Sequence, residues 1–330
     1  MRAEAPKKIV YLFGAGATHA ELANLAKDPL SEAFKKKKGL LISDVSSRVM
    51  AQAVNKSSYL KDIIMVSSTS GSLNIELFIS LIENSRICNW QKKTVYLKGL
   101  VEKDIKGIIK KEKSSFYLYK ALLDLHNDNE FKKKEKLLGL ISLNYDDVLD
   151  LAYKEIYRTK RPNYFFYPND TEGIPLLKLH GSFNWDRINI NGRKRNIQII
   201  PLGSNKSYIH APYNFIWNKA LEILIECDIL RIVGCSLSQN DFHLIDLLFK
   251  AHLEKGAAFD IEVIGPDKVG RNIKNFLGFF PNVKPLNEIE QSLIPDAKPI
   301  NPFKTWLAAK IRRAYGSRLP KTEYIKKVLK

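Results

Sequence analysis

The amino-acid sequence predicts an α/β fold: a Rossmann-like parallel sheet with an inserted helical module. From residue 137 onward, short apolar segments alternate with amphipathic segments of helical periodicity, which is typical of parallel strands connected by helices. Near the N-terminus, the β-branched and aromatic residues 7–13 end abruptly in Gly14-Ala15-Gly16-Ala17-Thr18, and an Ala/Leu/Glu-rich segment follows. That order predicts a strand, a tight turn and a helix N-terminus.

The segment between the first strand and residue 137 has helical character. We expect a helix over residues 19–35, limited by Pro29, two helices over 40–66, a Ser-rich loop at 67–72, and helices over 73–82 and 114–126. Residues of about 40–136 therefore form the predicted helical insertion.

The second half of the chain supplies the remaining strands and helices. We expect strands at residues 137–143, 176–179, 197–201, 229–233 and 259–264, with helices at 146–157, 213–226 and 239–253. Residues 1–300 then form one domain, and residues 301–330 form a basic C-terminal helical tail.

Composition limits the class of protein. A hydrophobic fraction of 45% in 330 residues implies a substantial core. No apolar run approaches the roughly 20 residues that span a bilayer, and the N-terminus lacks the apolar region of a signal peptide. We therefore expect no membrane association and a cytoplasmic location. The cysteines Cys88, Cys227 and Cys235 are scattered, so we expect no metal site.

Three further motifs follow predicted strands. They are Asn144-Tyr145-Asp146-Asp147, His180-Gly181-Ser182, and Gly234-Cys235-Ser236-Leu237. In open α/β sheets, ligands bind at the carboxyl ends of the strands. Small residues and free N–H groups at a helix start favour a phosphate, and a loop histidine can present an imidazole to a ligand. The alternatives are helix capping by Asn144 or Asp146 and a buried, hydrogen-bonded His180.

Together, the four motifs resemble sirtuin-like proteins, and more closely the sirtuin-like NADases of bacterial anti-phage defence systems. The resemblance covers roughly residues 8–265 and implies an NAD-binding Rossmann-type domain. It implies that Gly14, Ala15, Gly16, Ala17 and Thr18 hold the pyrophosphate, that Asn144 and Asp146 bind the nicotinamide-side ribose, and that Gly234, Ser236 and Leu237 line the adenosine side. Asn144 and His180 are the implied catalytic residues, with His180 as the base.

The chain also departs from the deacetylase sirtuins. It lacks their four zinc-binding cysteines and their Gly-Ile-Pro-Asp-Phe-Arg segment. This favours hydrolysis of NAD, as a substrate and without a metal, over protein deacylation. Nicotinamide leaves as a neutral molecule, so the site must stabilise an oxocarbenium-like centre and deliver water. Two alternatives stay open: an NAD- or ADP-ribose-binding sensor or scaffold subunit without turnover, and an oxidoreductase in which Asp44 binds a ribose.

The charge of +18 suggests an anionic partner, or a Lys-rich surface that only confers solubility. The tail from residue 304 to 330 holds nine lysines or arginines and one acid, Glu323. Its apolar residues must dock either on the chain's own core or on an assembly surface. We expect a homo-oligomer, with an acidic partner or nucleic acid at the basic surface. The resemblance suggests a HerA-type translocase or an Argonaute as partner.

Overall fold

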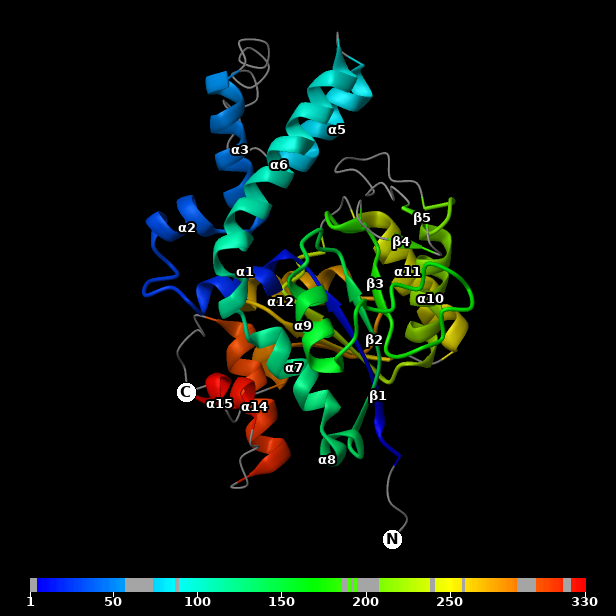
Figure 1. Cartoon of the computed structure of the whole chain (residues 1–330). Helices are drawn as coiled ribbons and strands as arrows, with labels where there is room; N and C mark the ends of the chain where they lie inside the picture. The colour runs from blue at the N-terminus through cyan, green and yellow to red at the C-terminus, as the bar shows by residue number, and fades with distance from the viewer. Residues whose placement is uncertain are drawn as a thin grey trace.

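A parallel sheet forms the centre of the computed structural model (Figure 1). The structure describes residues 5–56, 74–86, 89–185, 189–190, 193–194, 208–237, 241–256, 259–289, 301–316 and 322–330. Six strands are hydrogen-bonded in the order β3-β2-β1-β6-β7-β8, and every pair is parallel. Their bounds are β1 Lys7–Phe13, β2 Glu135–Ser142, β3 Leu176–Lys178, β6 Ile229–Val233, β7 Asp260–Ile264 and β8 Val283–Pro285. The α/β, Rossmann-like fold class is therefore confirmed.

Helices cover both faces of this sheet, with α7, α9 and α14 on one side and α10 and α11 on the other (Figure 1). Residues 9–13 of the central strand are fully buried, because both of its faces are covered. The helices are α1 Ala15–Ala23, α2 Glu32–Lys38, α3 Ile42–Lys56, α5 Ile75–Ser85, α6 Trp90–Glu112, α7 Leu118–Asn127, α8 Asn129–Lys132, α9 Val148–Tyr157, α10 Tyr213–Glu226, α11 Phe242–Lys255, α12 Asp267–Phe276, α13 Leu286–Ile289, α14 Pro302–Tyr315 and α15 Glu323–Leu329. A short antiparallel pair, β4 Asn189–Ile190 and β5 Arg193–Lys194, lies apart from the sheet.

The segment between β1 and β2 has two parts. Helices α3, α5 and α6 pack around their own hydrophobic cluster, which includes Val49, Phe78 and Leu97, and they project away from the sheet (Figure 1). Helix α7 instead belongs to the main core. The carboxylate of Glu21 in α1 accepts hydrogen bonds from the N–H groups of Tyr117, Leu118 and Tyr119 and so caps α7.

Element boundaries match the sequence prediction best where the periodicity is strong. The predicted strand at 229–233 and helix at 213–226 are β6 and α10 with the same bounds. The predicted single helix over 19–35 is wrong, because α1 ends at Ala23, before Pro29, and a separate helix, α2, begins at Glu32 with Ser31 as its N-cap. The predicted loop at 67–72 and strand at 197–201 lie outside the described residues, whereas β8 and α12 were not predicted.

The C-terminal helices pack on the sheet domain. Phe303, Trp306 and Leu307 of α14 are buried in the main core, as are Ile325 and Val328 of α15. The Trp306 ring meets the Tyr11 ring of β1 edge to face, with 6.2 Å between their centroids. Docking on the chain's own core, one of the two alternatives for the tail, is thus realised.

Candidate functional site

The carboxyl ends of β1 and β6 meet at the centre of the sheet. The chain order reverses between these two neighbours, since β1 leads on one side to β2 and β3 and β6 leads on the other to β7 and β8. Such a switch point is where doubly wound sheets bind ligands. Gly14 and the first turn of α1, together the Gly14–Thr18 turn, follow β1, and Gly234 follows β6, so two of the predicted motifs meet there.

Glycines allow these two loops to touch. The Gly16 N–H donates to the Gly234 carbonyl oxygen at 2.8 Å, and a Cβ added to Gly14 would lie 2.6 Å from the Cα of Cys235. Gly234 itself has φ +61, and a Cβ there would lie 2.1 Å from the Ala17 nitrogen. The glycines of the turn are therefore required by loop-to-loop packing, and the Gly16 N–H is already bonded.

Asn144 joins the loops after β1 and β2. It is 8% exposed, and its side-chain nitrogen donates to the Gly14 carbonyl oxygen at 3.0 Å and to Thr18 Oγ1 at 3.1 Å. Thr18 Oγ1 also lies 3.2 Å from the hydroxyl of Tyr119 in α7. Asn144 is therefore not a helix cap, and it fixes the turn after β1 against the end of β2.

Asp146 lies beside this network. Its Oδ1 accepts a hydrogen bond from the Val148 N–H at 3.0 Å, at the start of α9. Burial raises the pKa of the Asp146 carboxyl, and the nearby Lys178 charge only partly opposes that rise. Asp146 thus caps the start of α9, as the alternative proposed.

A buried ion pair lies next to the loop that carries Asp146. Lys178 Nζ lies 2.9 Å from Asp150 Oδ2, with the two side chains 1% and 0% exposed. The same ammonium donates to the Asp146 carbonyl oxygen, and the Tyr164 hydroxyl donates to Asp150. The sequence prediction missed this group. Its one local signal is a lysine inside the otherwise apolar strand 176–179.

His180 follows β3 and is 7% exposed. Its ring stacks on Tyr145, with 6.0 Å between the centroids, and Tyr145 stacks in turn on Phe183 at 5.4 Å. Gly181 has φ +83, which turns the chain sharply after the histidine. Both Phe183 N–H and Ser182 Oγ bond the Tyr145 carbonyl oxygen, so the loops carrying Asn144 and His180 are held together.

The remaining predicted residues differ in exposure. Ala17 and Leu237 are buried, Ala15 and Ser236 are exposed, and Leu237 has φ +47. Within residues 234–237, Gly234 alone forms a backbone hydrogen bond with the Gly14–Thr18 turn among the described contacts.

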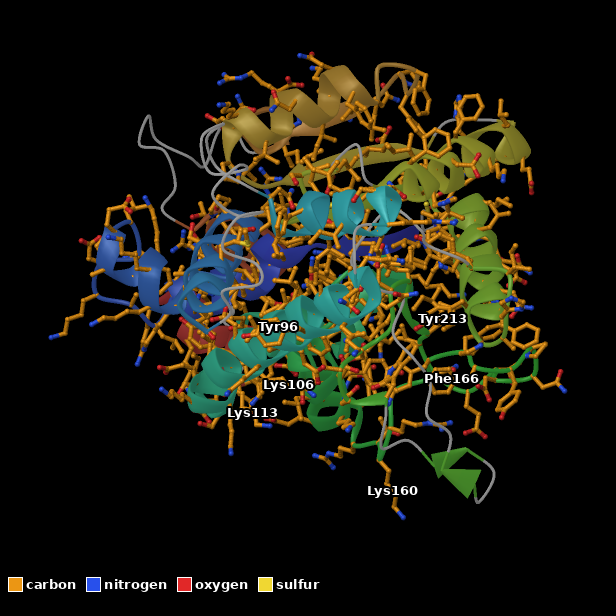
Figure 2. The ribbon with its side chains drawn as sticks, turned by 90° about the horizontal axis from the view of Figure 1, so that it is seen from above. Tyr96, Lys106, Lys113, Lys160, Phe166 and Tyr213 are labelled. Atoms are coloured by element: carbon orange, nitrogen blue, oxygen red, sulfur yellow. The ribbon has the colours of Figure 1, made fainter. Side chains whose placement is uncertain are left out.

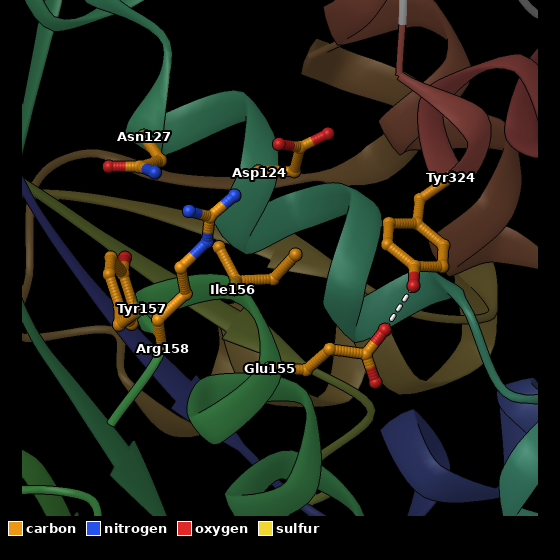
Figure 3. A pocket seen from close by; sticks show the side chains of 7 residues that line it. All are labelled: Asp124, Asn127, Glu155, Ile156, Tyr157, Arg158 and Tyr324. Atoms are coloured by element: carbon orange, nitrogen blue, oxygen red, sulfur yellow. Dashed lines mark hydrogen bonds between the residues drawn. The ribbon is translucent and has the colours of Figure 1, made fainter.

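Among the hollows formed by the described residues, two bear on the location of the site. One, of about 330 Å³, is lined by Asp146, Asp147, Phe183 and Asn184 and by residues of α6. Figure 2 looks onto this end of the molecule and shows Lys106 in α6 and Lys113 just after the end of that helix. The larger hollow, about 500 Å³, lies by the C-terminal ends of α7 and α9 and beside Tyr324 of α15, and contains none of the predicted site residues (Figure 3). The chemistry of the sequence motifs and the sheet topology both favour the first end.

Within the described ranges, no group of three or more His, Cys, Asp or Glu side chains is arranged to hold a metal ion. Among those residues, no helix is both long and apolar enough to cross a bilayer. The thiols of Cys227 and Cys235 are free and buried, and burial raises the pKa of each to about 12.

Comparison with known families gives one match. Residues 139–257 match the family described as a SIR2-like domain. This stretch includes Asn144, Asp146, His180 and Gly234, whereas the Gly14–Thr18 turn lies outside it. This part of the chain is therefore similar to SIR2-like domains. No curated protein matches.

Solved structures of Sir2 proteins are also similar. A mutant Sir2 homologue in complex with 2'-O-acetyl ADP ribose is 14% identical, over 81% of this chain and 83% of that chain, with a TM-score of 0.35. A structure on the mechanism and regulation of Sir2 enzymes is 13% identical, over 93% and 94%, with a TM-score of 0.35. A Sir2 complex with a peptide and NAD⁺ is 10% identical, over 82% and 93%, with a TM-score of 0.33.

Proposed function

We propose that this chain hydrolyses NAD to nicotinamide and ADP-ribose at the carboxyl edge of its sheet. The main support for the proposal is that hydrogen bonds connect the four sequence motifs with one another at the carboxyl edge of the sheet. Asn144 bonds the Gly14–Thr18 turn, that turn bonds Gly234, and the Asn144 and His180 loops share the Tyr145 carbonyl oxygen. The SIR2-like match over residues 139–257 supports the same assignment.

In the proposed reaction, the C1′–nicotinamide bond of NAD breaks and water supplies the new bond to C1′. His180 removes a proton from that water or from a ribose hydroxyl. The pyridinium nitrogen takes the bonding electron pair, so nicotinamide leaves neutral without a general acid. Because Asn144 binds Gly14 and Thr18 through its amide nitrogen, we assign it the positioning of the turn against the ribose.

The proposal is tested by incubating the purified chain with NAD and measuring nicotinamide and ADP-ribose. His180→Ala should lower nicotinamide release by about 10²–10⁴-fold. His252→Ala is the matched control, because His252 lies in the last turn of α11 and packs against Phe280 instead of the site loops. Wild-type turnover in His180→Ala would remove His180 from the reaction.

Asn144→Ala should also abolish turnover. It removes two hydrogen bonds to buried groups, so we expect an additional loss of stability of about 1–3 kcal/mol. Asn129→Ala, an exposed asparagine at the start of α8, is its control. A fully active Asn144→Ala variant would contradict the role of the Asn144 network.

We further propose that NAD depletion serves anti-phage defence and that the chain acts as a homo-oligomer with a HerA-type translocase or Argonaute as partner. These steps rest on the resemblance of the motifs and on the charge of +18. The alternative is a sensor or scaffold that binds NAD or ADP-ribose without turnover. Binding of NAD by the chain, with and without its genomic neighbours, and with no nicotinamide released, would favour that alternative.

A further inference from the structure

Helix α11 has apolar side chains on two opposite faces. The face toward the sheet consists of buried residues of the main core: Leu244, Leu247, Leu248 and Ala251. On the outer face, Phe242, Phe249 and Leu253 are exposed, and their spacing of seven and four residues places them in one stripe along the helix. A helix that is apolar on its outer face as well as its inner face is expected to be covered on both.

The end of α12 widens this stripe. Phe276, the last residue of α12, and Phe279 are both exposed. The Phe279 ring meets the Phe249 ring edge to face, with 5.3 Å between their centroids. We define the α11 patch as Phe242, Phe249, Leu253, Phe276 and Phe279. Single exposed apolar side chains are common on a protein surface, whereas a group of large ones around two helices marks an interaction site.

A pair of opposite charges borders the α11 patch on one side. Lys250 Nζ lies 2.7 Å from Asp246 Oδ2, and both side chains reach solvent. The helical period places both residues on the flank away from α12, since His252, on the other flank, packs against Phe280. The border thus holds one acid and one base, so it does not attract a polyanion.

The order of these residues along α11 is self-complementary. Asp246 and Lys250 lie two residues before and two residues after position 248, and Phe242 and Leu253 lie six before and five after it. Two copies of α11 that pack antiparallel about a twofold axis at position 248 therefore bring Asp246 opposite the partner's Lys250 and Phe242 beside the partner's Leu253. The symmetry repeats each of these contacts, as in an isologous interface.

We propose that the α11 patch joins two copies of this chain in a twofold dimer, in which α11 packs antiparallel on α11 of the second copy. The match of each acid with a base and of each apolar end with another favours a second copy over an unrelated protein. This inference rests on the homo-oligomer of the proposed function and gives it a surface, whereas it does not require NAD hydrolysis.

The first test measures the mass of the full chain by light scattering over a range of protein concentrations. The wild type should approach twice the chain mass of 37.7 kDa. Leu253→Asp should weaken association at least about tenfold, because it places a carboxylate in each of two apolar contacts. Leu30→Asp is the matched control, since Leu30 is 62% exposed, compared with 60% for Leu253, and lies outside the α11 patch. This control should keep the wild-type mass.

The second test reverses the charges. Asp246→Lys alone should weaken the dimer, because two lysines then face each other across the interface, and Lys250→Asp alone should do the same with two acids. The double variant with both changes restores opposite charges and should recover the dimer. Because both side chains reach solvent, the circular dichroism spectrum should be the same in all three variants.

A wild type of single-chain mass at every concentration, or a dimer that Leu253→Asp leaves intact, would overturn the proposal. A double charge variant that stays as weak as the single ones would overturn the antiparallel arrangement. Binding of a monomeric wild type to phosphatidylcholine vesicles that Leu253→Asp abolishes would also overturn it, since the patch would then face lipid. His180→Ala should remain dimeric, so a failure of NAD hydrolysis and a failure of this interface give different results.

Discussion

The Gly16 N–H donates a hydrogen bond of 2.8 Å to the carbonyl oxygen of Gly234. This bond joins the loops after β1 and β6 at the point where the strand order reverses. The two glycines are 218 residues apart in the chain. The proposed NAD site is built on this contact.

Gly234→Ala should unfold or strongly destabilise the chain. Its φ of +61 strains any other residue, and the new Cβ would lie 2.1 Å from the backbone nitrogen of Ala17, which cannot move without shifting the turn. Gly256→Ala is a matched control, because Gly256 has φ +64 with open space around it. In urea unfolding, we expect Gly256→Ala to lower the free energy of unfolding by about 1 kcal/mol and Gly234→Ala to lower it several times more. Equal losses would show that the close contact is unimportant.

Lys178→Met should reduce the free energy of unfolding by about 3–5 kcal/mol, because it leaves the carboxylate of Asp150 buried without its partner. Adding Asp150→Asn should recover part of the loss, since no charge then remains buried. Lys133→Met removes the exposed pair with Glu130 and should change stability by less than about 1 kcal/mol. A mild effect of Lys178→Met in denaturant melts would contradict a structural role for this pair.

Stability should fall as the pH drops below about 6.5. Burial lowers the pKa of His126 from 6.5 to about 3, so the native state keeps this ring neutral while the unfolded chain takes up a proton. Burial raises the pKa of Glu135, but hydrogen bonds and charges from Arg231 and Lys310 outweigh it and lower the pKa from 4.5 to about 2. Both groups therefore make the unfolded state bind more protons in acid.

The expected slope is up to about 1.4 kcal/mol per pH unit for each group, between pH 6.5 and 3 for His126 and between pH 4.5 and 2 for Glu135. Thermal melts of the wild type and of His126→Gln across pH 7 to 5 test this. The variant should show a flatter profile, and parallel profiles would exclude His126 as a source of acid sensitivity.

Trp306→Ala should lower the free energy of unfolding by about 3–5 kcal/mol, because the ring is 1% exposed and packs against Tyr11.

Deleting residues 304–330 would remove this core contact as well, so deletion does not isolate an assembly role of the tail. Arg312→Glu with Lys326→Glu changes exposed positions of α14 and α15 and should leave the melting temperature nearly unchanged. If the tail forms an assembly surface, this variant should lower the mass seen by light scattering at low salt; an unchanged mass would argue against that role.

Local pattern determined much of the fold. The strand at residues 229–233 and the helix at 213–226 have their predicted bounds, because an apolar run and a 3.6-residue period are properties of neighbouring residues. The short β8, which ends at Pro285, was missed because three residues give too weak a signal. The order of the motifs along the chain also predicted which loops share the candidate site, since parallel strands end at the same edge.

Only the tertiary structure decided what those residues contact. The sequence predicted that Gly14 and Gly16 form a tight turn that binds a phosphate, and the structure shows in addition that both glycines pack directly against residues 234–235. It also pairs Lys178 with Asp150 and bonds Asn144 to Gly14 and Thr18. Such contacts depend on the order of strands in the sheet and on burial of both faces, and residues far apart in the chain leave no periodic signal of their pairing.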